Sequence, residues 1–486
     1  MNKTIPLKTL LLSALWLLTS VATAGVLPIG QPEYDFLYDR IERLDALTLD
    51  RFDFQIAPYR IDRWSDNLGP FQPLDRVRGE RLLIGLHFTE DLSAAKQVKP
   101  AGFEKLRGVV AGQPMKNLSV YGSFVLDEEL AKDPEYTGKK WRGLAGNVQQ
   151  AFVAYNTSRF DFLFGRFGGF WGPRRSLVFS PSQNLDGLAY SFRWGRLVIS
   201  YRLARLDGLT PEREGVESFE NRWVAAHRYD FHFGPKFTVG LFETVVFGGP
   251  GRQLELFYLN PLIFFHGTQL NESLDDNTQV GFDFSFKPKA GVKVYGQVLV
   301  DDLQLDDKVE SDREPDQLGI LGGVYLADLI DNTDIRLEYS RVSNWTFNQR
   351  FARNRYTNDG LPIGSAAGND YDLLDLSVIR WLRDCLAVSA NLSYRRQGEG
   401  RIEAEWTMPW LEVEGDYSEP FPTGTVQKTL TASLGAKGFL YGHFFFDLEA
   451  GVDRVENRFH VESADETLPF VNLTLSGFVL PTVDID

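Results

Sequence analysis

The chain has 486 residues, and its 66 acidic side chains outnumber its 51 basic ones, which gives a formal net charge of −15. Nucleic acid is excluded as an expected partner, because its binding depends on basic patches that neutralise phosphates. The single cysteine, Cys385, cannot form an internal disulfide, and no CxxC, HExxH or HxH spacing occurs. We therefore predict no disulfide framework, no metal site and no cofactor.

Residues 1–24 have the features of a secretory signal peptide. Lys3 and Lys8 precede an apolar run, and Ala22-Thr23-Ala24 supplies an A-x-A cleavage site. The apolar run is too short to span a membrane as a helix, and no later window offers the roughly 20 apolar residues that a spanning helix needs. If this protein is embedded in a membrane, we expect it to cross with strands.

Residues 25–80 are expected to form an N-terminal helical or plug segment. Apolar side chains recur at helical spacing over about three turns, with charged residues between them, at Tyr34, Leu37, Ile41, Leu44 and Leu47. This apolar stripe needs a partner, which is either a barrel that the helix plugs from inside or beneath, or the surface of a soluble domain.

Residues 81–486 are expected to form a single outer-membrane β-barrel. The region is a succession of short runs that alternate apolar and polar residues, most of them about 7 to 12 residues long, as a tilted strand needs to cross a bilayer. In one run Phe282, Phe284 and Phe286 share a face that opposes Asp283. The fold class is therefore all-β, a transmembrane antiparallel barrel of roughly 16–18 strands with its phenylalanines toward lipid.

The connections between these runs are of two sizes, as in barrels that have short turns at one end and long loops at the other. Asn156-Thr157-Ser158 is a tight turn. Long polar loops are predicted over residues 89–118, 128–147, 207–220, 301–317, 343–372 and 397–425. A soluble β-sandwich or propeller also places aromatic residues at strand ends, so that feature alone does not decide the class of fold.

A Trp-Gly-Pro-Arg-Arg turn at residues 171–175 is a candidate polysaccharide-binding site. Proline fixes φ and glycine permits unusual backbone angles, so we expect Trp171 to be held on a stiff turn where its ring can stack on a sugar. Arg174 and Arg175 can pair with uronic-acid carboxylates through charge-assisted hydrogen bonds. The alternative is that Trp171 is a packing anchor in the lumen and that both arginines pair with internal acids.

Three tryptophans in predicted long loops are the second candidate for polysaccharide binding. Trp345, Trp406 and Trp410 lie among amides and carboxylates, the side chains that a carbohydrate-binding surface uses. Loop packing is the simpler explanation of the same tryptophans, and this alternative stays open.

Polar residues on the predicted strands are expected to line the lumen and to be structural. These are Arg228 and Glu243, interpreted as a charge pair, together with Asp276 and Asn277. Contact with a glycan or an ion is the alternative for the pair. Whether the acidic loops bind a divalent cation, for which oxygen ligands are suited, is also open.

Several motifs occur in an order that resembles the Wzi-type capsule-assembly proteins, which are outer-membrane β-barrels of Gram-negative bacteria. They are GRFGGFWGPRRSLVFS (165–180) and then RWVAAHRYDF, LFETVVFG, YLNP, LDDN, GFDFSF and VYGQVLVDD, within residues 159–302. The chain ends in PTVDID rather than in an aromatic residue, which leaves open which strand closes the barrel.

This resemblance implies a non-enzymatic, lectin-like barrel in the cell outer membrane that binds or organises capsular or extracellular polysaccharide. Its other implied partners are outer-membrane lipid, lipopolysaccharide and the barrel-assembly machinery. The first alternative is a porin or passive channel, and the second is a membrane-embedded hydrolase. No G-x-S-x-G motif indicates a Ser-His-Asp triad, and we predict no enzyme activity. The sequence does not identify the polysaccharide, the oligomeric state or whether the lumen is open.

Overall fold

The computed structural model describes most of the chain. The described residues are 26–49, 56–60, 81–95, 98–133, 136, 138–181, 183–211, 216–272, 274–303, 314–414, 417–440, 444–479 and 482–484. The predicted signal peptide, residues 1–24, lies outside them.

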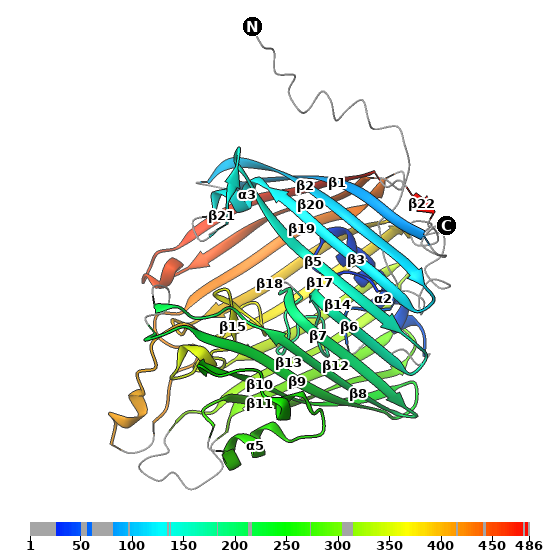
Figure 1. Cartoon of the computed structure of the whole chain (residues 1–486). Helices are drawn as coiled ribbons and strands as arrows, with labels where there is room; N and C mark the ends of the chain where they lie inside the picture. Colours follow the sequence, from blue (N-terminus) through cyan, green and yellow to red (C-terminus); the bar gives the residue numbers. More distant parts are fainter. Residues whose placement is uncertain are drawn as a thin grey trace.

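Within these residues, 18 antiparallel strands close into a barrel (Figure 1). They are β1 (Arg81–Ala95), β2 (Val98–Met115), β3 (Leu118–Asp127), β5 (Leu144–Asn156), β6 (Phe160–Phe167), β7 (Leu185–Trp194), β8 (Leu197–Arg205), β9 (Glu220–His232), β10 (Phe237–Pro250), β11 (Asn277–Lys289), β12 (Val292–Asp302), β13 (Gln317–Ile330), β14 (Thr333–Val342), β17 (Tyr371–Arg383), β18 (Leu386–Gln397), β19 (Gln427–Leu440), β20 (Phe444–Glu456) and β21 (Glu466–Val479). The predicted fold class is confirmed.

Strand β21 closes the barrel, because it pairs antiparallel with β1 and places Phe478 opposite His87. Two short strands, β4 (Lys140–Trp141) and β22 (Thr482–Asp484), extend the main sheet, and β15 (Thr357–Asn358) pairs with β16 (Leu361–Pro362) separately. Phe478 is buried and contacts the ring of His87 at 4.6 Å between centroids.

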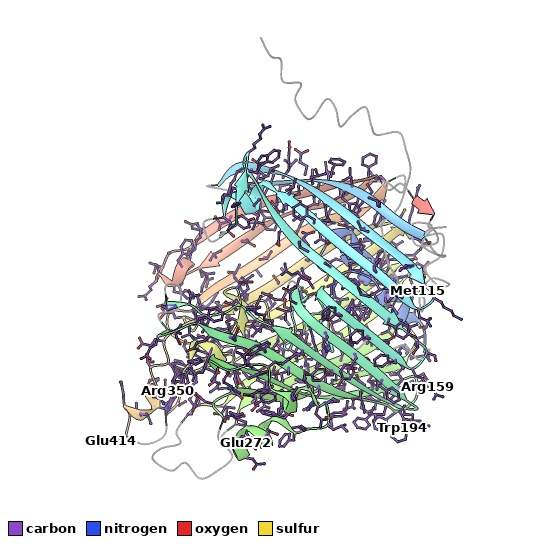
Figure 2. All side chains as sticks on the ribbon, viewed as in Figure 1. Met115, Arg159, Trp194, Glu272, Arg350 and Glu414 are labelled. Carbon is purple, nitrogen blue, oxygen red and sulfur yellow. The ribbon has the colours of Figure 1, made fainter. Side chains whose placement is uncertain are left out.

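The two ends of the barrel differ as the connection lengths predict. Figure 2 shows Met115, Arg159 and Trp194, which lie at short turns, at one end, and Arg350 and Glu414, which lie in long loops, at the other. Long loops are extracellular in such barrels and short turns periplasmic. The end that carries Arg350 and Glu414 is therefore the extracellular end.

The alternation of side chains separates a lipid-facing surface from the lumen. On β11, Phe282 and Phe286 are exposed on the outer face, whereas Asp283 between them is fully buried inside. Period-2 alternation of this kind places every second residue toward lipid. The predicted orientation of these phenylalanines agrees with the structure.

One predicted loop, residues 89–118, is wrong. Strands β1 and β2 run through most of it and meet in a hairpin at Ala95 and Val98. A loop was expected here because the stretch is rich in charged residues. In the structure these residues form ion pairs: Lys105 of β2 lies 3.1 Å from Asp91 of β1 and 2.8 Å from Glu129, which follows β3. Cross-strand ion pairs of this kind are compatible with a strand that extends beyond the membrane.

Helix α2 (Pro32–Leu47) lies inside the barrel near the short turns (Figure 1). Its apolar side chains Tyr34, Leu37 and Ile41 are buried, as the helical spacing predicts. Phe36 contacts Trp381 of β17 edge-to-face at 5.5 Å between ring centroids. Within the described residues no helix combines the length and apolar character needed to cross a membrane.

The charged residues of α2 are also buried or half-buried, because they pair with the barrel wall instead of meeting solvent. The pairs join α2 to β2, to strands from β11 to β19 and to the turn after β17: Glu33 with Arg107 (2.6 Å), Asp39 with Lys437 (2.5 Å), Arg40 with Asp384 (2.6 Å), Glu42 with Arg336 (2.6 Å), Arg43 with Asp334, and Asp45 with Lys287 (2.8 Å) and Lys293 (3.0 Å). The helix is therefore fixed to the inner wall by ion pairs along its length.

We predict that Asp45→Ala destabilises the folded barrel by about 3–5 kcal/mol, because it leaves Lys287 and Lys293 buried beside an empty position. The measurement is the urea midpoint of the heat-modifiable form on gels. The matched control is Glu129→Ala, which removes an exposed contact to Lys105 and is expected to cost less than about 1 kcal/mol. Equal midpoints for the two variants would contradict the structural role of the α2 ion pairs.

Candidate functional site

The polar network in the lumen is centred on Arg228 of β9. Its guanidinium is fully buried and contacts Asp283 of β11 at 2.5 and 2.7 Å and Asp230 at 2.7 Å. Gly172 packs tightly beside this group with φ 78°, and a Cβ there would lie 2.6 Å from the Asp283 carboxylate. Glycine is therefore required at this turn for both its backbone angle and its small size.

The expected charge pair between Arg228 and Glu243 is wrong, because the two side chains lie on opposite faces of the wall. In the register of β9 and β10, Arg228 is opposite Phe242, whereas Glu243 is opposite His227. Glu243 faces outward, 3.1 Å from His227 Nε2, and accepts hydrogen bonds from the backbone N–H groups of Phe265 and His266.

Asp276 also lies outside the lumen, which corrects the second part of that interpretation. It pairs with Arg252 and accepts a hydrogen bond of 2.6 Å from the Tyr258 hydroxyl on the outer side of the wall. Asn277 does face inward, where its amide donates to the carbonyl oxygen of Asn354 at 3.0 Å. In the described parts of the chain, no group of three His, Cys, Asp or Glu side chains is arranged to hold a metal ion.

The Trp-Gly-Pro-Arg-Arg turn lies in the lumen and not at the cell surface. Trp171 is buried against Phe179, with 5.1 Å between ring centroids, and its carbonyl oxygen accepts from Ser176 and Gln297. Arg174 pairs with Asp39 and, at 3.2 Å, with Asp35 of α2. These contacts correspond to the packing alternative for this turn.

Arg175, the last residue of the turn, is the more exposed of its two arginines. Its guanidinium lies 3.2 Å from Asp375 and 3.6 Å from Glu338. Both acids belong to the inner face of the wall, so Arg175 also has internal acidic partners.

Electrostatics hold α2 against the turn and the wall. Burial favours the neutral form of Asp39, but Lys437 and Arg174 outweigh it and hold the pKa of this carboxyl below its ordinary value. Burial likewise opposes ionisation of Glu33, and Arg107 together with His87 still lowers its pKa to about 2. Both carboxylates are therefore charged at neutral pH and contribute ion pairs between α2 and the residues around it.

Trp345, Trp406 and Trp410 meet in one cluster that joins two extracellular loops. Their ring centroids lie 5.1, 5.3 and 5.6 Å apart in edge-to-face geometry. Trp345 and Trp410 are only 7% and 3% exposed. The indole N–H of Trp345 donates to Glu419 at 2.9 Å. The structure brings these predicted residues together, but as a packed core of the loops and not as an open surface.

Glu419 has a second partner in the same loop cluster. The Tyr417 hydroxyl donates to it at 2.8 Å, and burial together with the charge of Glu419 raises the pKa of Tyr417 above its ordinary value. The hydroxyl therefore stays protonated and holds the loop that carries Trp410.

A cavity of about 410 Å³ opens among these loops at the extracellular end. Its walls come from the loop before β17, the end of β18, the loop between β18 and β19, the start of β19 and the turn between β20 and β21. We name this cavity the extracellular cup, and its polar and aromatic lining includes Asn369, Arg395, Gln397, Arg401, Glu403, Gln427, Phe459 and His460.

Phe459 is the most exposed aromatic residue of the cup, at 73%. It lies in the 3-10 turn η6 (Arg458–His460) with φ 57°, and its neighbours Asn457 and His460 also have positive φ. Left-handed backbone is strained for a phenylalanine and costs about 1–3 kcal/mol per residue, so it persists only where other contacts enforce it. Here the Phe459 N–H donates to Gln427 at 2.8 Å, which fixes the turn on β19.

Two arginines give the cup its positive charge. Arg395 at the end of β18 is half-buried and forms no ion pair with a described residue. Arg401 donates to His460 Nε2 at 2.7 Å, while His460 Nδ1 donates to the carbonyl oxygen of Thr425 at 2.8 Å. This arrangement requires the neutral tautomer of His460 with its hydrogen on Nδ1.

These features suit recognition of a sugar chain at the surface. An exposed ring can stack on a sugar face, and guanidinium groups form strong hydrogen bonds with carboxylates. Arg395, Arg401, Phe459 and His460 were not identified from the sequence. Only the run of polar residues after β20 marks a turn there, and it does not reveal the left-handed backbone that exposes Phe459.

Comparison with known proteins gives one family and a set of similar folds. The family model described as capsule assembly protein Wzi matches residues 115–468. The Escherichia coli outer-membrane protein Wzi, described as a carbohydrate-binding β-barrel involved in group 1 capsule assembly, is 15% identical and has a TM-score of 0.64; the match covers 93% of this chain and 99% of that chain. At this identity the likeness shows the fold.

Two Pseudomonas aeruginosa structures match less well. OccD3 (OpdP) has a TM-score of 0.48 at 10% identity, covering 83% of this chain and 92% of that chain. OccK3 (OpdO) has a TM-score of 0.48 at 12% identity, covering 85% and 99%. No curated protein sequence matches the chain significantly.

We predict that Trp410→Ala makes the loop between β18 and β19 sensitive to protease added to intact cells, while the barrel stays heat-modifiable. Removal of a buried tryptophan costs about 3–5 kcal/mol, and here the loss falls on the loop cluster. Leu411→Ala, at the exposed neighbouring position, is the control and is expected to leave the loop resistant. Resistance of the Trp410→Ala loop would show that the cluster does not hold these loops together.

Proposed function

Because the chain belongs to the Wzi family of capsule assembly proteins, whose model matches residues 115–468, we propose that it binds capsular or extracellular polysaccharide at the cell surface without cleaving it. The protein is an outer-membrane β-barrel. The observation that carries the proposal is the extracellular cup, where the exposed ring of Phe459 lies in one cavity with Arg395 and Arg401.

The filled lumen supports surface binding over transport. Helix α2 is paired with strands around the barrel, and the turn at Trp171 packs on its extracellular side through Arg174. Two cavities within this interior measure about 70 and 20 Å³, which is space for water and not for a sugar chain. A polysaccharide is therefore expected to stay outside, against the loops.

The charge of the cup indicates an acidic polysaccharide. The whole chain carries a net charge of −15, so an acidic polymer is repelled from most of its surface. Arg395 has no carboxylate partner among the described residues, and it can offer its guanidinium to a uronic acid. With Arg395 and Arg401 against the single carboxylate Glu403, the lining of the cup carries a small excess of positive charge on a negative protein, which favours binding of an acidic polymer at the cup.

We predict that loss of the protein moves acidic polysaccharide from the cell pellet to the medium without lowering the total amount made. Complementation with Phe459→Ala or Arg395→Ala is expected to lower the cell-bound fraction, because each variant removes one contact worth about 1–3 kcal/mol. Uronic acid assayed in pellet and medium is the measurement.

The matched control for this experiment is Phe233→Ala, which removes an exposed phenylalanine at the short-turn end of the barrel. It is expected to retain polysaccharide as the unaltered protein does. Full retention by both cup variants would exclude the cup as the binding site, and an equal loss in pellet and medium after deletion would contradict the proposed role itself.

A further inference from the structure

The segment between β10 and β11 leaves the extracellular rim and folds down over the outside of the barrel. It contains the 3-10 turn η3 (Leu256–Leu259) and helix α5 (Phe265–Glu272). Figure 1 shows α5 outside the wall, beside β10 and β11. We name the described residues of this segment, 251–272 and 274–276, the outer flap.

The inner side of the outer flap is bonded to the strands beneath it. The Tyr201 hydroxyl donates to the Tyr258 carbonyl oxygen at 2.6 Å, and the Tyr229 hydroxyl donates to the carbonyl oxygen of Pro261. Tyr258 and Phe265 are completely buried in a cluster with outward-facing side chains of β8, β9 and β10. The flap is therefore a fixed element of the wall.

The outer flap also covers charge that would otherwise face the membrane. Glu243 lies near the middle of β10 on its outer face, and its two oxygens accept the N–H groups of Phe265 and His266 at 2.9 and 2.7 Å. A carboxylate exposed to hydrocarbon is costly, and these hydrogen bonds bury and satisfy it. The flap thus lies at the depth where lipid contacts the neighbouring strands.

The exposed side of the flap carries large apolar side chains, with the uncharged Asn260 and the polar His266 among them. Leu256, Leu262, Phe264 and Leu270 are 78, 71, 60 and 67% exposed. Between Leu256 and Asn271 the sequence contains no Asp, Glu, Lys or Arg. A surface loop of a protein with this acidic composition is expected to carry charge, so a stretch without any indicates a partner that excludes charge.

This apolar side continues a surface that already faces lipid. Strands β9, β10 and β11 beneath the flap carry the exposed outward side chains Phe231, Leu241 and Phe282. The four most exposed apolar residues of the flap are separate side chains spread along a turn and a short helix. They suit insertion among acyl chains better than the close packing of a protein interface.

We propose that the outer flap is inserted in the outer leaflet, where Leu256, Leu262, Phe264 and Leu270 contact the acyl chains of membrane lipid. The flap then replaces part of the wall's lipid-facing surface and ties the extracellular end of the barrel to the leaflet that faces the cell exterior. This role does not depend on polysaccharide binding, because it uses the outside of the wall and not the cup.

The test places a bimane label at Leu262→Cys in a Cys385→Ser background and reconstitutes the full protein in phosphatidylcholine vesicles with or without brominated acyl chains. We expect brominated lipid to quench the label as strongly as it quenches a label at Phe282→Cys on the wall. A label at Leu411→Cys, which is exposed in an extracellular loop, is the water-facing control and is expected to lose little fluorescence.

Two results would overturn the proposal. Quenching at Leu262→Cys that is no stronger than at Leu411→Cys would place the flap in water. The second result combines two observations: neither brominated lipid nor aqueous iodide quenches the label, and the unlabelled Leu262→Cys protein forms disulfide-linked dimers. Together they would show that a second copy of this chain covers the flap. Heat-modifiability of each variant on gels establishes that the barrel is folded in every sample.

Discussion

Ion pairs between α2 and the inner wall determine how the interior of this barrel is filled. A charge taken out of water must meet a partner, because an unpaired buried charge costs several kcal/mol. Asp45 between Lys287 and Lys293, and Asp39 between Arg174 and Lys437, meet this requirement at two places along the helix. The helix consequently has one position in which all of its charges are paired, and the barrel closes around it.

The turn at Trp171 depends on this position. Arg174 is held by α2, Gly172 fits against the Arg228–Asp283 pair, and Trp171 packs on Phe179. The extracellular loops then close over this filled interior. The surfaces that we propose for binding are accordingly the outermost ones: the cup with Phe459 and Arg395 at the extracellular end, and the outer flap on the outside of the wall.

The fold could be predicted from the sequence because alternation reports directly which residues face lipid. Phe282 and Asp283 are assigned to opposite faces by their spacing alone, and the structure agrees. Register between strands is not contained in that pattern. A shift of one residue exchanges the two faces, and this is why Glu243 was assigned to the lumen beside Arg228 although it faces outward beside His227.

The candidate site could be predicted less well. Loop tryptophans such as Trp345 and Trp410 look alike in sequence whether they are packed or exposed, and here they are packed. Conversely, Phe459 is exposed by a left-handed backbone that no sequence pattern marked. The stretch with YLNPLIFF reads as a loop, and only its contacts with Tyr201 and Glu243 reveal an element on the outer wall.

The central claim is that the barrel is a closed scaffold for surface binding and not a pore. Single-channel recording of the purified, folded protein in planar bilayers tests it most directly. A lumen filled by α2 and the Trp171 turn predicts that the bilayers stay silent under applied voltage. Reproducible ohmic conductance steps would contradict this account and favour a channel.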